Sequence, residues 1–204
     1  MRRAWSSSRA LGLRAPLDAL PDPKPAAIPV TMVATDTALF AGFEEELRRS
    51  GEDDSLEVLG RARFCRGGVT TMYVASDEKG APIYAQWLVT SADQDRLHAV
   101  TGGLFPPLHD GEVLVEGAYT FIAFRKLGVM ADGMHQLLVI ARDAGAHSAI
   151  TYVTDDNVPS LRGCARAGFD LDHVRMTTRR LGIRRSVRRP LDDDARAAWQ
   201  RALA

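Results

Sequence analysis

The alternation of strand-like and helix-like segments constrains the fold of this chain more than any other feature of its sequence. Strand segments are short runs rich in β-branched and aromatic residues, whereas helix segments repeat apolar residues at spacings of three and four. From residue 28 onward the order is β-α-α-β-β-β-α-β-α-β-β, which predicts an α/β fold. The predicted segments are strand 28–34, helices 36–47 and 55–64, hairpin strands 69–76 and 82–90, strand 112–124, helix 128–145, strand 148–154, helix 159–167 and two strands within 169–189.

The first 27 residues differ in composition from the remainder of the chain. Four arginines precede the first acidic residue, Asp18, and four prolines follow between residues 21 and 29. Proline at this density neither continues a helix nor fits inside a sheet. We therefore predict a flexible arm over 1–27, a folded domain over 28–191 and a short helical tail over 192–204. Two alternatives for the arm stay open, an Arg-rich targeting segment and a start assigned too early in the sequence.

Composition excludes several classes of protein. With 46% hydrophobic residues among 204, the chain is too apolar for disorder throughout and is long enough for one core. Two cysteines, Cys65 and Cys164, are too few for a disulfide scaffold. No apolar run approaches the roughly 20 residues of a membrane span. The 26 basic and 26 acidic residues balance, so the overall charge offers no general attraction to nucleic acid or membrane. A cytoplasmic location with free thiols is expected, because no secretory signal is evident.

Two motifs carry a resemblance to a known family. The first leaves a predicted strand and enters a predicted helix, and its residues are Arg125, Lys126, Leu127, Gly128, Val129, Met130 and Ala131. The second reads Tyr-Val-Thr-Asp-Asp-Asn from Tyr152 to Asn157, Ser-Leu at 160–161 and Ala-Gly-Phe at 167–169. Together they resemble the GNAT superfamily of N-acetyltransferases over about residues 28–189, whose pyrophosphate loop has the pattern Gln/Arg-x-x-Gly-x-Gly/Ala. The resemblance implies a mixed, mostly antiparallel central sheet with helices on both faces.

The first motif suits a diphosphate. A helix N-terminus presents unpaired N–H groups and partial positive charge, and a glycine such as Gly128 lets an anion approach that backbone closely. Arg125 can add a charge-assisted hydrogen bond. The resemblance implies that residues 125–131 bind the diphosphate of acetyl-CoA, the acyl donor. A simple strand-to-helix turn is the alternative for Gly128, and Met130 departs from the family pattern, which has Gly or Ala at that position.

The second motif supplies a helix cap and, by resemblance, a contact with the pantetheine arm of coenzyme A. Asn157 precedes Pro159 and is suited to cap a helix. The family also uses an asparagine here to contact pantetheine, which implies that this arm lies along Val153 and Thr154. Cys164 stands where many members carry the tyrosine that protonates the leaving thiolate, and a thiol with a pKa of about 8.5 can donate a proton. A small buried helix residue is the alternative for Cys164.

Acyl transfer to an amine requires a base, because an alkylammonium with a pKa of about 10.4 is mostly protonated at neutral pH. The family often places this base on the strand before the phosphate loop. Glu112 and Glu116 lie on that predicted strand with the same parity, so both project to one face. Small and apolar neighbours favour Glu116, since partial burial raises the pKa of a carboxyl group. A surface position is the alternative for Glu116. Tyr119 and Tyr152 are substitutes for the missing acid, although core packing is the more typical role for each.

The remaining polar residues give weaker signals. The five histidines show no spacing typical of a metal site, so no metal is expected. Seven arginines crowd the last two predicted strands, namely Arg175, Arg179, Arg180, Arg184, Arg185, Arg188 and Arg189. They favour a solvated strand face or a patch for an acidic substrate, because aromatic residues are not interleaved and Asp192 to Asp194 follow at once.

These observations predict a coenzyme A-dependent N-acyltransferase that moves an acetyl group from acetyl-CoA to a primary amine by direct attack. Its partners would be acyl-CoA and a small-molecule or peptide amine, with no membrane and no nucleic acid, and a homodimer stays open. Residues 91–111 are expected to shape the acceptor side. Met130 and the absent tyrosine motivate an alternative, a catalytically impaired acyl-CoA-binding or interaction module of the same fold. An RNA-associated protein that uses the Arg-rich end is a third hypothesis.

Overall fold

An eight-stranded sheet forms the centre of the molecule. The computed structural model describes residues 5–35, 37–51, 71–181 and 183–204, so the predicted helix 55–64, the start of the predicted strand 69–76 and Cys65 lie outside the described residues. The strand order across the sheet is β2-β3-β4-β5-β6-β1-β7-β8. Among these strands only β5 and β6 pair in parallel, which confirms a mixed, mostly antiparallel sheet. The strands are β1 (Trp5–Pro16), β2 (Val33–Ala34), β3 (Met72–Ser76), β4 (Pro82–Thr90), β5 (Glu112–Thr120), β6 (Ser148–Val153), β7 (Asp170–Arg180) and β8 (Ile183–Arg189).

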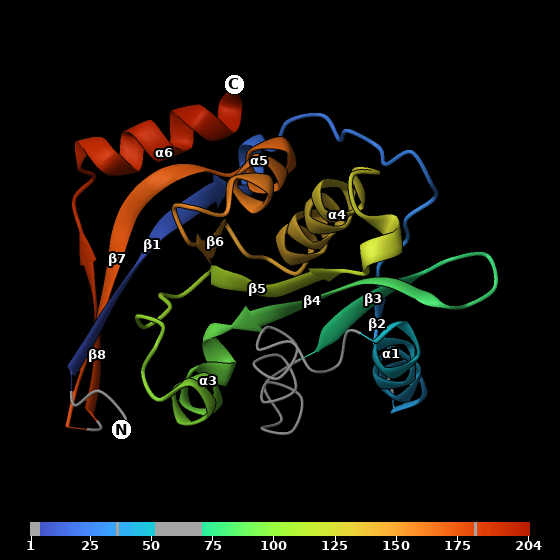
Figure 1. Cartoon of the computed structure of the whole chain (residues 1–204), viewed down its shortest axis with the longest axis horizontal. Helices are drawn as coiled ribbons and strands as arrows, with labels where there is room; N and C mark the ends of the chain where they lie inside the picture. Colours follow the sequence, from blue (N-terminus) through green and yellow to red (C-terminus); the bar gives the residue numbers. More distant parts are fainter. Residues whose placement is uncertain (1–4, 36, 52–70, 182) are drawn as a thin grey trace.

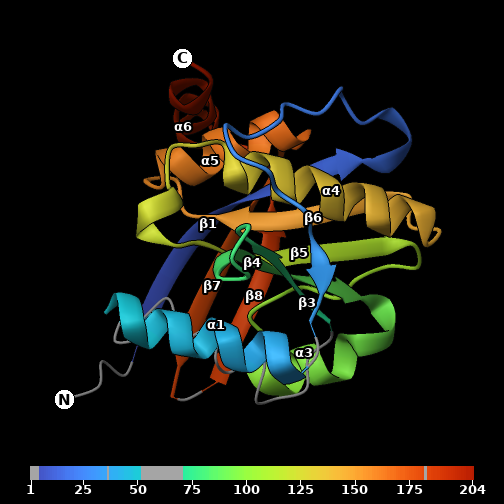
Figure 2. The same cartoon turned by 90° about the vertical axis from the view of Figure 1, so that its right-hand side faces the viewer.

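Helices cover both faces of the sheet, as the sequence predicts. Figure 1 shows α4, α5 and α6 on one face, here called the first face, and α1 and α3 on the other, the second face. Figure 2 gives the same arrangement from the side. The helices are α1 (Thr37–Ser50), α3 (Gln94–Thr101), α4 (Val129–Asp143), α5 (Val158–Ala167) and α6 (Asp193–Leu203), with 3-10 turns η1 (Leu17–Ala19), η2 (Ser91–Asp93) and η3 (Ile122–Phe124).

Apolar side chains fill the layers on both faces. Alternate residues of a strand point to opposite faces, so Val113 and Val115 join the core under α4 and α5, while Leu114 joins the core on the second face. By the same parity, Glu112 and Glu116 project to the second face. The polar residues considered below therefore share the face that carries α1 and α3.

The strand β1 shows that the prediction of a flexible arm over 1–27 is wrong for residues 5–16. β1 lies between β6 and β7 and is antiparallel to both, and Leu11 pairs with Val153 on one side and Val174 on the other. Leu11 and Leu13 are completely buried. The prediction gave weight to arginines and to later prolines, whereas the relevant signal is the period-two alternation of apolar residues from residue 11 to residue 15.

Residues 20–32 connect this central strand with the far edge of the sheet and lie along α4. The N–H of Ala26 donates to Asp132 Oδ2 at 2.8 Å, and the N–H of Ala27 donates to the carbonyl of Leu127 at 2.8 Å. Gln136 accepts from the N–H of Met32 and donates to the carbonyl of residue 30. The proline-rich stretch is therefore held by hydrogen bonds without regular structure, and the predicted first strand 28–34 is reduced to the two residues of β2.

A truncation of one buried side chain tests whether β1 is part of the core. Leu13→Ala should lower the free energy of unfolding by about 2–5 kcal/mol, because Leu13 is fully buried beneath the helices of the first face. The measurement is urea denaturation followed by circular dichroism. Leu203→Ala is the matched control, since Leu203 is 53% exposed and should change stability by no more than about 0.5 kcal/mol. Equal stability of the two variants would instead support the prediction that residues 1–27 form a flexible arm.

Candidate functional site

The strands β5 and β6 separate beyond a short paired stretch, and we call this parting the β5–β6 split. Their parallel pairing joins residues 112–114 to residues 148–150, although β5 continues to Thr120 and β6 to Val153. At Gly117 the backbone has a φ of +70°, and the register between β4 and β5 shifts near this point. A glycine accommodates this left-handed conformation without strain. In open α/β sheets, ligands bind in such openings beyond the carboxyl ends of strands.

The helix α4 begins after β5, at the position where the sequence predicts a diphosphate loop. β5 ends at Thr120, the turn η3 follows, and α4 starts at Val129. Gly128 occupies the N-cap position with a φ of +84°, and no described side chain caps the helix start. The first-turn N–H groups therefore lack the side-chain oxygen that usually satisfies one of them, and they keep the partial positive charge of a helix N-terminus.

The start of α4 is surrounded by α5, by residues 20–32 and by the exposed side chain of Arg125. The sulfur of Met130 lies 3.0 Å from the position that a Cβ on Gly163 would take, so Met130 packs on α5. Ala26 approaches from residues 20–32, with its Cα 3.3 Å from the corresponding position on Gly128. Asp132 accepts hydrogen bonds from the N–H of Ala26 and from Gln136 Nε2, so its carboxylate is engaged with that segment. Arg125 is exposed and its Nε donates to the carbonyl of Thr120 at 3.0 Å.

Glu116 and Tyr152 lie on opposite sides of the β5–β6 split. Each stands two residues beyond the last parallel pair, Leu114 and Ile150, and both project to the second face. Glu116 is half-buried, and its Oε1 accepts from the N–H of Gly117 at 3.1 Å. Burial raises the pKa of Tyr152 and the charge of Glu116 adds to this effect, while nearby arginines oppose it. The tyrosine hydroxyl therefore holds its proton at neutral pH.

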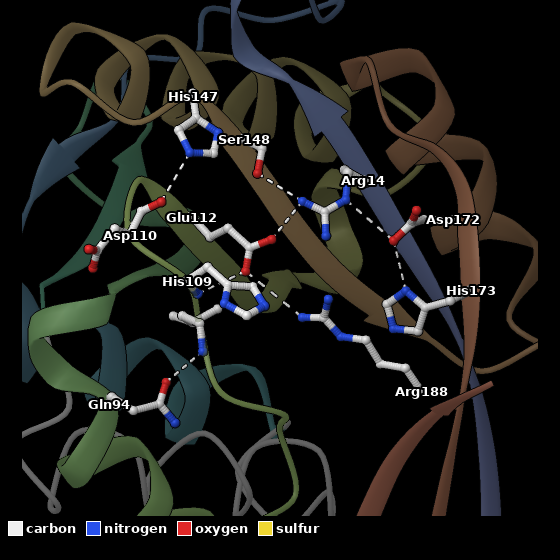
Figure 3. Close-up of polar contacts among 11 residues, drawn as sticks. Arg14, Gln94, His109, Asp110, Glu112, His147, Ser148, Asp172, His173 and Arg188 are labelled. Carbon is white, nitrogen blue, oxygen red and sulfur yellow. Dashed lines mark hydrogen bonds and ion pairs between the residues drawn. The ribbon is translucent and has the colours of Figure 1, made fainter. Parts of the chain in front are cut away.

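Arg14 organises a network of polar side chains at the paired ends of β5 and β6 (Figure 3). Its Nη1 donates to Glu112 Oε1 at 2.7 Å and to Ser148 Oγ at 2.9 Å, and its Nε donates to Asp172 Oδ2 at 3.3 Å. Arg188 Nη2 lies 3.9 Å from the other oxygen of Glu112. The network joins residues of β1, β5, β6, β7 and β8, so it ties together strands on both sides of the split.

Within this network Glu112 is a structural anion. Burial raises the pKa of its carboxyl group, but the N–H of His109, which donates at 3.0 Å, and the guanidinium of Arg14 outweigh burial and lower the pKa overall. Only 4% of the residue is exposed. An ionised carboxylate that is held by these donors is a poor proton acceptor, so Glu112 is poorly suited to act as a base.

His173 is a neutral imidazole in the same region. Its Nδ1 lies 2.9 Å from Asp172 Oδ2, and burial lowers its pKa more than the charge of Asp172 raises it. The ring covers Gly12 of β1 so closely that a Cβ there would lie 2.4 Å from two ring atoms. Among the described residues no cluster of His, Cys, Asp or Glu could hold a metal ion.

In the second predicted motif, Asn157 is a helix cap and Cys164 is a core residue. Asn157 caps α5, since its side chain accepts from the N–H of Ser160 at 3.2 Å. Val153 is half-buried at the end of β6, and Thr154 is exposed just beyond it. Cys164 is completely buried in the core of the first face, and burial strongly raises the pKa of its thiol. This position matches the alternative of a small buried helix residue and gives no support to proton donation by Cys164.

Sequence reasoning missed several residues that the fold brings to this region. Arg14 lies in the predicted flexible arm, and Asp172 and His173 belong to no motif. Arg175 and Arg188 were treated as two of seven arginines, but the register of β7 and β8 places them directly opposite each other on the second face. Strand parity within residues 171–189 is the signal that separates inward from outward arginines.

The fold can be compared with solved structures, whereas sequence comparison with family models and with curated proteins finds no match. An acetyltransferase of the GNAT family from Colwellia psychrerythraea aligns with a TM-score of 0.54 and 13% identity, over 85% of this chain and 56% of that one. The chain has the GNAT fold. A GCN5-related N-acetyltransferase from Sphaerobacter thermophilus aligns with a TM-score of 0.54 and 12% identity, over 91% of this chain and 54% of that one.

A third similar structure is a GCN5-related glucosamine N-acetyltransferase region of a fungal multi-domain β-N-acetylglucosaminidase, with a TM-score of 0.58, 12% identity, and coverage of 89% of this chain and 21% of that one. This chain therefore spans about half the length of the first two proteins and a fifth of the third. The identities are low, so the likeness establishes the GNAT fold, which is the fold that the two motifs predict. None of the helices in the described part of the chain is long and apolar enough to cross a membrane.

The buried ion pair between Glu112 and Arg14 predicts that removal of the Glu112 charge lowers stability in a pH-dependent way. Glu112→Gln should lower the free energy of unfolding at pH 7 by about 1–3 kcal/mol, because Arg14 loses its charged partner at a buried site. The folded-state pKa of Glu112 is depressed, so its contribution is present above about pH 4.5 and is lost as the pH falls through the folded-state pKa. The difference from the wild type should therefore narrow in acid.

Urea denaturation at pH 7 and at lower pH measures this difference. Glu45→Gln is the matched control, since Glu45 also faces an arginine but its side chain is 65% exposed on α1. Exposed pairs contribute no more than about 1 kcal/mol, so the control should stay close to the wild type at every pH. Equal effects of the two variants would show that the network around Arg14 adds no stability.

Proposed function

We propose that this chain is a coenzyme A-dependent N-acyltransferase that moves an acetyl group from acetyl-CoA to a primary amine. The observation that carries the proposal is the uncapped start of α4, which follows β5 where β5 and β6 have parted in a GNAT fold. First-turn amides and their partial positive charge suit a diphosphate. Acetyl-CoA supplies an acyl group that is activated by its bond to a thiol.

The residues of the first motif suit the donor by their chemistry. The amides at the start of α4 would hold the diphosphate, and Gly128 has no side chain to cover them, although Ala26 packs against one side of Gly128. Arg125 adds a cation that is exposed beside the same helix start. Pantetheine would follow the split along Val153 and Thr154 toward Asn157. Asp132, the acid of the first turn, is engaged with residues 20–32.

Glu116 and Tyr152 divide the proton transfers in this proposal. Glu116 takes a proton from the ammonium of the acceptor, which frees the nitrogen lone pair for attack on the acyl carbon. The C–N bond forms as the C–S bond breaks, the electron pair of that bond leaves on sulfur, and the nitrogen gives its second proton to water. The hydroxyl of Tyr152, which burial keeps protonated, lies across the split and supplies a proton to the thiolate. Cys164 is too deeply buried for this role.

A binding module without turnover is the second candidate. The observation that favours it is the close approach of Ala26 to Gly128, together with Met130 in place of a small residue. Both narrow the space around the helix start on which the donor depends. Acetyl-CoA binding without thiol release from any amine would support this module over the enzyme.

Removal of one cation tests the donor site. Arg125→Gln should weaken acetyl-CoA binding by about three- to tenfold, with a smaller effect at high salt, because the exposed guanidinium contributes a screened charge-assisted contact. Arg142→Gln is the matched control, because it removes the same charge from the opposite end of α4. Arg142 is exposed there, roughly 20 Å from the helix start. Isothermal calorimetry measures both. Failure of the wild type to bind acetyl-CoA would overturn the proposal.

Neutralisation of the base tests the chemistry. Glu116→Gln should reduce thiol release at neutral pH by about 10²- to 10⁴-fold and leave acetyl-CoA affinity unchanged, because the amine then keeps its proton. Glu78→Gln, in the exposed turn between β3 and β4, is the control and should retain the full rate. A normal rate in Glu116→Gln would assign the base to another group.

A further inference from the structure

Arg175 crosses the sheet to reach the β5–β6 split. It belongs to β7 and faces Ala10 of β1 on the second face, next to Gly12. These small residues leave room for side chains of β7 above β1. The guanidinium carbon consequently lies 4.2 Å from the ring centroid of Tyr152, and 5.1 Å from that of Phe105 in the connection between α3 and β5. Arg175 is therefore held between two aromatic rings, one of which borders the split.

The hydrogen-bond donors of Arg175 are not used by the described protein. Its Nε and Nη1 are buried and have no hydrogen-bond partner among the described residues. No ion pair in the described ranges involves Arg175 either. A buried cation with unmet donors is unfavourable, and such groups in native proteins call for a partner. Burial lowers the pKa of Arg175, and the charge of Glu116 partly offsets this effect.

Arg175 lacks the ion-pair partners that its neighbours Arg14 and Arg188 have among the described residues. Arg14 contacts Glu112 and Asp172, and Arg188 points toward Glu112 in Figure 3. Arg175 lies opposite Arg188 across β7 and β8, but among the described residues no ion pair joins it to Glu112 or Asp172. Arg175 as a whole is half-buried, although its Nε and Nη1 are themselves buried. Two parallel N–H groups of a guanidinium match the two oxygens of a carboxylate.

We propose that Arg175 binds a carboxylate of the acceptor, so that the acceptor is an amino acid or a related amine that carries a carboxylate. This inference rests on the proposed function, because it places the amine at Glu116 and the carboxylate at Arg175, on either side of Tyr152. The carboxylate of Glu116 and the guanidinium of Arg175, held apart on one face, complement the ammonium and the carboxylate of a zwitterion. The aromatic rings fix the plane of the guanidinium and thereby orient the bound molecule.

Matched acceptors test this inference. A panel of amino acids and their carboxamides is offered to the wild type with acetyl-CoA, and thiol release is measured. The best amino acid should exceed its amide in kcat/KM by about 30-fold or more, because the amide leaves the buried donors of Arg175 without an anion. Arg175→Met should abolish this preference, mainly through KM. Arg179→Met is the control, since Arg179 lies on the same face of β7 but is exposed, and should retain the preference.

A binding measurement keeps the test independent of turnover. Calorimetry of the same amino acids and amides with the coenzyme A-loaded protein should detect binding of the acid alone, and Arg175→Met should lose it. Arg175→Met and Arg175→Gln should remain as stable as the wild type in urea, since each removes an unpartnered buried charge. Equal affinity for acid and amide, or binding of neither, would overturn the role of Arg175. Loss of acetyl-CoA binding in the wild type would instead overturn the proposed function.

Discussion

The position of β1 between β6 and β7 is the constraint on which the rest of the structure depends. One side of this strand is apolar, and Leu11 and Leu13 fill the core beneath the helices of the first face. Its other side carries small residues, Ala10 and Gly12, followed by Arg14. A strand with this pattern can be covered by helices on one face and crossed by long side chains from β7 on the other. Larger residues at the small positions would hold His173 and Arg175 away from Tyr152.

Charge compensation explains how so many arginines share one face. Arg14 and Arg188 lie against Glu112, and Arg14 also contacts Asp172. His173 contributes no charge because burial lowers its pKa. A buried pair is stable only when its remaining hydrogen bonds are satisfied, and Ser148 and the N–H of His109 meet this requirement. Arg175 has no ion-pair partner among the described residues, and this is the basis for the proposal that it binds an external anion.

The parts of the fold that were predicted well are those in which one local segment carries the whole signal. The helix α4 follows from apolar residues at helical spacing after Gly128, and Asn157 caps α5 through its own side chain. The order of the strands and of α4 and α5 after residue 70 follows from such segments, whereas α3 lies within residues 91–111, where no helix is predicted. The assignment of residues 1–27 failed because a central strand is identified by its partners, and the partners of β1 lie more than 130 residues away. Cys164 illustrates the same limit, since its burial is set by packing.

The sequence by itself determined the class of fold and the loop that opens α4, because periodicity, glycine and caps act over a few neighbouring residues. Only the tertiary structure decided which acids and arginines meet. Parity placed Glu112 and Glu116 on one face, but the parting of β5 from β6 separated their roles, leaving one in an ion-paired network and the other beside Tyr152. The physical reason is that the pKa of an acidic group and the energy of its ion pairs depend on burial and on partners from distant strands. Strand pairing across the sheet sets both.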